Sequence, residues 1–261
     1  MPTVQQIHDY LKTLAPEYMA MEWDHIGLLC GRSDREVRKI LVALDPFPHV
    51  CKEAKELDCQ LLVTHHPVLW KIETVNDGDI TGRSLLYLIE NGISALNAHT
   101  NLDCAPGGVN DCLAAALGLQ QVQVIDPDGT DEQGRPYGLL RGGSIPTTDP
   151  ETFVQKVKAA LGCEGVRYVG GRPITKVAVG GGSCGDSIYR VAQLGYDALV
   201  TADCKYNQFA DAAEYGITLI DAGHFQTENP VCAYVARQLQ AAFPQVEVLE
   251  SKVHKDCICF A

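Results

Sequence analysis

Four histidines stand where buried strands are expected to end, and a carboxylate follows two of them. The histidines are His65, His66, His99 and His224, and the carboxylates are Asp103 and Glu228, each four residues beyond a histidine. Imidazole nitrogen and carboxylate oxygen together suit zinc, iron, manganese or nickel. One bridging carboxylate can hold two such ions about 3.5–4 Å apart, with a shared hydroxide as nucleophile. Any one of these histidines alone would be an ordinary polar loop residue, but together they predict a metal site.

Short apolar runs predict the strands that would position these side chains. The runs that precede the histidines are residues 60–64, 93–97 and 217–221. Pro67 follows His65 and His66 and cannot donate a ladder hydrogen bond, so the first strand should end before it. Ligands bind at the carboxyl ends of strands in open α/β sheets. We therefore expect the histidines at strand ends, with each carboxylate folding back toward its histidine from an extended loop.

The alternation of strand and helix occurs twice along the chain. Residues 39–64 match residues 176–201 without a gap, and residues 90–98 match residues 214–222. Chance similarity between α/β units is the alternative, but the ungapped match favours an internal duplication. The fold class expected is α/β, with two related lobes and the metal site in the cleft between them.

The predicted lobes are residues 1–124 and residues 125–261. The first lobe would contribute the His-His pair and Asp103, and the second would contribute His224 and Glu228. A last strand is expected near residues 257–260, and the C-terminal segment could pack back on the first lobe.

The composition is that of a globular, strongly acidic protein. Hydrophobic residues make up 46% of the chain, charged residues 21%, and the formal net charge is −12. Nucleic-acid binding is disfavoured because phosphate contact needs clustered Lys and Arg. No run approaches the ~20 apolar residues that span a membrane, and residues 1–6 lack the features of a signal peptide. We expect a cytoplasmic protein that acts on a small molecule.

The eleven cysteines are scattered without a repeated spacing. That distribution fits reduced thiols better than a disulfide framework. Cys257 and Cys259 form a close pair, but no second pair completes a zinc site, so core packing is favoured. Cys104 follows Asp103 and is an alternative nucleophile. A metal site accounts for more of the histidines at once.

Two further features leave alternatives open. Residues 180–185 are rich in glycine, follow a strand and precede a helix. They could cradle a phosphate at the helix N-terminus or simply make a tight turn. The remaining histidines lack neighbouring ligands and are interpreted as surface or structural residues: His8, His25, His49 and His254.

Six stretches between residue 23 and residue 228 carry a recognisable pattern. They are residues 23–28, 64–67, 97–103, 105–111, 179–183 and 221–228. The runs His-His-Pro and Ala-His-Thr-Asn-Leu-Asp within them are the most specific. By these motifs the chain resembles the GTP cyclohydrolase 1 type 2 homologues, the YbgI-like dinuclear metal-binding proteins. It departs from their usual pattern at His25 and at Asn207, neither of which is a proposed ligand.

This resemblance implies two divalent metal ions per chain and a set of ligands. Those ligands are His65, His66, Asp103, His224 and Glu228. Glu228 would bridge both ions, His66 and Asp103 would complete one site, and His65 and His224 the other. The resemblance also implies that His99 is a catalytic residue that transfers protons, and that six copies form a toroidal homohexamer.

The function expected from the residues and the resemblance is that of a metal-dependent hydrolase. Its substrate would be nucleotide-like or another small anionic molecule, as the family name implies. A non-catalytic metal-binding or metal-delivery protein is the alternative, because exchangeable ligands would serve that role equally well.

Overall fold

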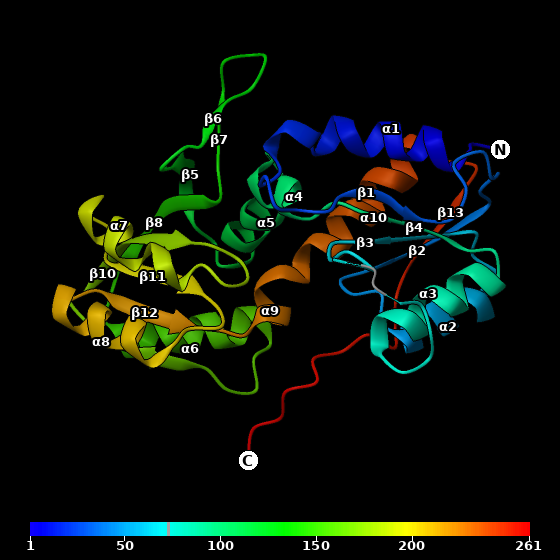
Figure 1. The fold of residues 1–261 in the computed structure, drawn as a ribbon. Helices are drawn as coiled ribbons and strands as arrows, with labels where there is room; N and C mark the ends of the chain where they lie inside the picture. The colour runs from blue at the N-terminus through cyan, green and yellow to red at the C-terminus, as the bar shows by residue number, and fades with distance from the viewer. Residues whose placement is uncertain (72–73) are drawn as a thin grey trace. The chain divides into compact units, whose positions relative to one another are not determined.

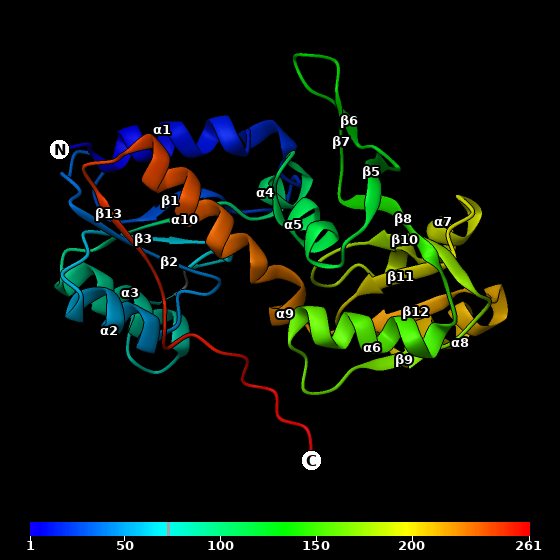
Figure 2. The same cartoon turned by 180° about the vertical axis from the view of Figure 1, so that it is seen from behind.

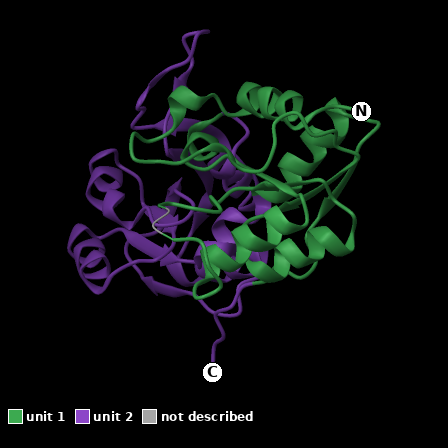
Figure 3. Ribbon diagram, turned by 45° about the vertical axis from the view of Figure 1, so that its right-hand side comes forward, with its two compact units in different colours: residues 1–105, 231–255 green, residues 106–230, 256–261 purple. Residues whose placement is uncertain are grey.

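The computed structural model describes residues 1–71 and 74–261, which form two compact units, each built on its own sheet (Figure 1). Unit 1 comprises residues 1–105 and 231–255, and unit 2 comprises residues 106–230 and 256–261 (Figure 3). Relative to a division at residue 124, α5 (Val109–Ala116) belongs to unit 2. Nearly all of α10 (Pro230–Ala242) belongs to unit 1.

Unit 1 has a five-stranded sheet in the order β1-β4-β3-β2-β13. Its strands are β1 (Gly27–Cys30), β2 (Lys39–Ala43), β3 (Leu61–Thr64), β4 (Ser94–Asn97) and β13 (Glu247–Glu250). All neighbours are parallel except β1, which is antiparallel to β4. Every residue of β3 and β4 is buried. Such burial on both faces explains why the two strands do not alternate between apolar and polar residues; β3, for example, begins with three apolar residues in succession.

Helices cover both faces of this sheet. α2 (Pro48–Glu56) and α3 (Ile80–Glu90) pack on one face, where their apolar residues share a core with β2 and β3. α1 (Val4–Leu14) and α10 lie on the opposite face (Figure 2). Thr3 caps α1 through a capping box, since its side chain accepts from the Gln6 N–H and the Gln6 side chain accepts from the Thr3 N–H.

Unit 2 has a six-stranded sheet in the order β5-β8-β10-β11-β12-β9. Its strands are β5 (Gln120–Ile125), β8 (Leu140–Thr148), β9 (Arg167–Val169), β10 (Ile174–Val179), β11 (Ala198–Thr201) and β12 (Thr218–Asp221). β10, β11 and β12 are parallel, and the outer pairings are antiparallel. A short hairpin pairs β6 (Gly129–Thr130) with β7 (Pro136–Tyr137).

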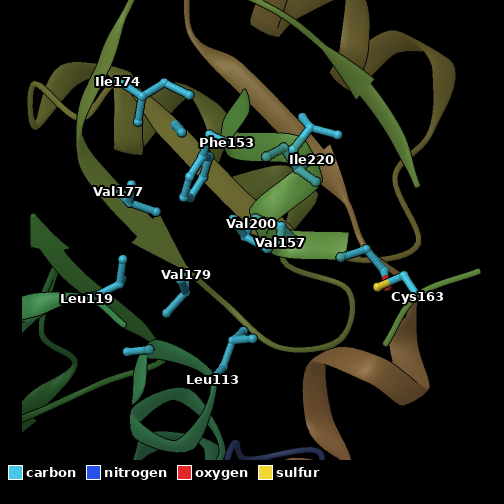
Figure 4. Close-up of a cluster of buried hydrophobic side chains, with 14 residues drawn as sticks. Leu113, Leu119, Phe153, Val157, Cys163, Ile174, Val177, Val179, Val200 and Ile220 are labelled. Carbon is cyan, nitrogen blue, oxygen red and sulfur yellow. The ribbon is translucent and has the colours of Figure 1, made fainter. Parts of the chain in front are cut away.

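The faces of the second sheet are also covered by helices. Phe153 and Val157 of α6 (Pro150–Leu161) pack with Val177, Val200 and Ile220 of the central strands (Figure 4). The other face packs against α7 (Ile188–Gln193) and α8 (Tyr206–Tyr215). Each unit is therefore an α/β layer structure, as the sequence predicts.

The two sheets share one strand register at the positions of the predicted repeat. The equivalent pairs are Val42↔Val63 with Val179↔Val200, and Thr64↔Asn97 with Thr201↔Asp221. Side-chain contacts are equivalent too. Gln60 accepts from the N–H groups of Arg38 and Lys39. Asp197 accepts from those of Thr175 and Lys176. The duplication itself remains an interpretation, and the shared register is what supports it.

The predicted strand at residues 257–260 is wrong. In the described part of the chain this segment has neither strand nor helix geometry, and Cys257 and Cys259 are exposed rather than packed in a core. A run of four residues that alternates in character has little stability as a strand unless a sheet edge pairs with it. Among the described helices, none combines the length and the apolar character needed to cross a membrane.

Candidate metal centre

β3 and β4 bring three histidines of unit 1 together at one edge of its sheet. His65 and His66 directly follow β3, and His99 lies two residues beyond β4. Because the strands are parallel neighbours, their carboxyl ends lie side by side. One ring nitrogen of each histidine lies within 4.8 Å of the others. Asp103 completes the group, with its Oδ1 3.6 Å from His65 Nε2.

Short helices, rather than extended loops, carry the carboxylates. α4 (Thr100–Cys104) begins directly after His99 and contains Asp103. α9 (His224–Glu228) is a single turn in unit 2 that holds both of its predicted ligands. Residues four apart on a helix share one face. His224 Nε2 consequently lies 2.9 Å from Glu228 Oε2, and the expectation of extended loops is corrected to helical turns.

Each of the four histidines has its Nδ1 atom against an oxygen acceptor. The pairs are His65 with the Ala98 carbonyl at 2.9 Å, His66 with Asp45 at 2.7 Å, His99 with Asp24 at 2.8 Å and His224 with Asp203 at 2.7 Å. An oxygen acceptor places the ring proton on Nδ1, so the Nε2 atom presents a lone pair. Metal-ligating histidines typically have this arrangement, in which a carbonyl or carboxylate fixes the ring and its tautomer.

Two of the acceptor carboxylates are kept ionised by their surroundings. Burial alone would raise the pKa of Asp24, but hydrogen bonds from His99 and Thr100 outweigh it and lower this pKa to about 2. Asp45 is partly buried, which alone would raise its pKa, but hydrogen bonds from His254 and His66 hold this pKa well below the usual range. Both carboxylates can therefore accept the Nδ1 protons across the physiological pH range.

The glycine-rich loop of residues 180–185 packs against Glu228. Gly182 has a φ of +62°, and a Cβ atom there would clash with the Glu228 carboxylate. The loop's N–H groups already have partners, because Gly181 donates to Asn110 Oδ1 at 2.7 Å and Gly182 donates to Thr227 Oγ1 at 3.1 Å. These contacts favour the tight-turn alternative over a phosphate cradle.

Three aspartates that contact the histidine rings were not among the residues predicted for the site. Asp45 lies two residues beyond β2 and Asp203 two residues beyond β11, so both had the strand-end signal used for the histidines. Asp24 had no such signal, because it lies before β1 rather than after a strand. Asp203 also has a φ of +52°. A non-glycine residue seldom adopts that conformation, and strain of this kind clusters at functional sites.

The donor set fits divalent metal ions. Each unit by itself offers suitable donors, three imidazoles and Asp103 in unit 1 and His224 with Glu228 in unit 2, and the ring tautomers suit coordination. This mixture of nitrogen and oxygen accepts zinc, iron, manganese or nickel without selecting one. Cys104, the alternative nucleophile, is completely buried in α4. A nucleophilic thiol needs access to substrate, so the metal interpretation is favoured.

Comparisons with known proteins agree over nearly the whole chain. A family model described as Duf34/NIF3 (NGG1p interacting factor 3) matches residues 2–257. A Clostridium perfringens protein named GTP cyclohydrolase 1 type 2 homolog is 33% identical over 260 residues, 97% of each chain. A Streptomyces coelicolor protein of the same name is 38% identical over 249 residues, 92% of this chain and 86% of that one. Both proteins have the name of the family whose motifs this sequence resembles.

A solved structure extends the agreement to the fold. The crystal structure of a Bacillus cereus protein described as related to NIF3 superposes with a TM-score of 0.94 at 25% sequence identity. The match covers 100% of this chain and 99% of that one.

Proposed function

The chain belongs to the Duf34/NIF3 (NGG1p interacting factor 3) family, and on that premise we propose that it is a dinuclear metal-dependent hydrolase. Its substrate would be a nucleotide-like or other small anionic molecule, the class that the name GTP cyclohydrolase 1 type 2 homolog of its relatives suggests. The observation that carries the proposal is the shared orientation of the histidines, with each Nδ1 held by an oxygen.

The proposed ligands would hold one pair of divalent ions. Glu228 would bridge the pair, His66 and Asp103 would complete one coordination set, and His65 and His224 would complete the other. The room that Gly182 leaves for the Glu228 carboxylate supports its role as the bridge.

Such ions would polarise the substrate and lower the pKa of a water molecule. The chain's own part is proton transfer. His99 is held through Nδ1 by Asp24, which leaves Nε2 to accept and return a proton. The buried Asp24 carboxylate stabilises the imidazolium that forms, as in other aspartate–histidine pairs.

Metal content tests the ligand assignment. Elemental analysis of the purified protein should give two ions per chain, and His65→Ala and Glu228→Ala should each lose metal. His49→Ala is the matched control, because this histidine is exposed and lies outside the cluster. Unchanged metal content in His65→Ala would contradict the assignment.

Turnover separates a hydrolase from a metal-delivery protein. The metal-loaded chain should hydrolyse GTP or a related nucleotide. His99→Ala should keep its metal but lose roughly 10²–10⁴-fold in kcat, the usual contribution of general acid–base catalysis. A fully loaded protein that turns over no nucleotide would overturn the hydrolase proposal and favour metal binding or delivery.

A further inference from the structure

Two large aromatic side chains remain exposed beside the histidine cluster of unit 1. Trp23 is 62% exposed and Trp70 is 46% exposed. Burial of an indole is strongly favourable, and exposed aromatic surface beside polar groups is typical of a contact site. These side chains have no role in the proposed metal chemistry, so their exposure needs another explanation.

The two indoles form one aromatic surface next to His99. Their ring centroids are 6.0 Å apart and their planes are inclined by 34°. Each meets the His99 ring edge-to-face, Trp23 at 6.2 Å and Trp70 at 5.3 Å. His25 extends the surface, with its ring 6.3 Å from that of Trp70. The spacing leaves no slot between the indoles, so a ligand ring would stack on their open faces.

Short backbone links fix this surface relative to the residues that do chemistry. Trp23 directly precedes Asp24, whose carboxylate accepts from His99 Nδ1 at 2.8 Å and from the Thr100 N–H at 3.0 Å. The Met21 N–H donates to Thr100 Oγ1 at 2.9 Å and holds the same turn. Trp70 lies four residues beyond His66. Trp23 is therefore positioned by the same contacts that orient His99, which reduces the cost of ordering this indole on binding.

We propose that Trp23 and Trp70 bind the planar ring of a purine-like ligand and present its reactive part to His99. This inference rests on the proposed function and adds a binding surface to it. A small heteroaromatic molecule fits better than a protein partner, because the occupant must stack on the indoles and also reach the histidine cluster. Stacking on aromatic side chains tolerates any ring with a π-face. The surface therefore selects for a planar ring, and the metal site determines which group of the ligand reacts.

The sequence makes the test direct. Trp23 and Trp70 are the two tryptophans of the chain, so its tryptophan fluorescence reports only on this surface. Titrating the metal-loaded protein with guanosine monophosphate should quench the emission saturably. Ribose 5-phosphate, which keeps the sugar and phosphate but lacks the ring, should not. An equal response to both probes would overturn the proposal.

Variants then assign the surface. Trp23→Ala and Trp70→Ala should each raise the Kd for guanosine monophosphate by roughly tenfold, whereas Trp→Phe should stay within about threefold because a ring remains. Tyr189→Ala is the matched control, an exposed aromatic on α7 that is 55% accessible and should leave Kd unchanged. Unaltered Kd in both alanine variants contradicts the inference.

The binding readout also separates this inference from the proposed hydrolysis. Tight ring binding through the tryptophans with no turnover would remove the proposed reaction and keep the surface. Turnover with an unchanged KM in the alanine variants would support the proposed reaction and exclude the tryptophan surface as the binding site. Metal content measured in every variant confirms that the histidine cluster is intact.

Discussion

Gly182 shows how the absence of a side chain can make room for a candidate metal ligand, the carboxylate of Glu228. Its left-handed backbone and its contact with Glu228 both depend on the absence of a Cβ atom. Gly182→Ala should cost about 1–2 kcal/mol for the left-handed conformation and should also displace the carboxylate, so metal is lost. Urea unfolding and elemental analysis of the same preparation measure the two effects.

Gly195→Ala is the control that separates the cost of a left-handed backbone from the effect of a clash with Glu228. Gly195 has a φ of +77°, but nothing lies within 4 Å of the position a Cβ would take. It should lose a similar amount of stability and keep all its metal. Equal metal content in the two variants would show that Gly182 does not act through Glu228.

At the residue scale, the sequence groups the candidate ligands but not the aspartates that hold their rings. The histidines and their carboxylates share short spacings along the chain, so sequence alone groups them. Asp24 lies 75 positions from His99, and Asp203 lies 21 positions from His224. Such contacts depend on how strands and turns meet in space, and a single sequence carries no record of those distances.

At the element scale, Asp197 links two strands of unit 2. Its carboxylate accepts from the Thr175 and Lys176 N–H groups at 3.0 and 2.9 Å and from Arg172 Nε at 2.7 Å. Asp197→Asn should destabilise the protein by about 1–2 kcal/mol at pH 7, since hydrogen bonds to a charged group are the stronger kind. Denaturant unfolding at several pH values measures the effect.

The pH dependence of this effect has a defined sign. Burial favours the neutral acid, but the hydrogen bonds from Lys176, Arg172 and Thr175 outweigh it and lower the pKa of Asp197. A lowered pKa gives stability that is present above the unfolded value, about 4, and is lost as the pH falls through the folded value. The variant should therefore converge on the wild type in acid. Asp211→Asn, at an exposed position on α8, should show no such change, and a constant deficit in Asp197→Asn at every pH would refute the carboxylate's role.

Element prediction succeeded where length and periodicity were sufficient. The buried strands of both units were found because short runs dominated by apolar residues, such as Leu61–Thr64 of β3 and Ala198–Thr201 of β11, leave few alternatives. α4 and α9 have five residues each, too few to show a helical period. Residues 257–260 failed for the opposite reason, because a pattern typical of strands needs a neighbouring edge, which no local signal reports.

At the scale of the whole molecule, we expect six copies to assemble. The toroidal homohexamer is implied by the resemblance, and six copies of the 28.3 kDa chain have a mass of about 170 kDa. Sedimentation equilibrium or light scattering on the metal-loaded protein measures that mass directly. A single species at the mass of a monomer or dimer would exclude the ring.

Because unit 1 is made of two segments far apart in the chain, its sheet cannot be completed until the second segment has been synthesised. β13 pairs with β2 in the register Glu247↔Lys39, so the ribosome must add about 200 residues before that edge of the sheet is covered. His254 comes later still, and its Nε2 lies 3.0 Å from Asp45, the residue that orients His66. A nascent chain therefore completes the support of His66 only after residue 254 has been added, 188 residues after His66 itself.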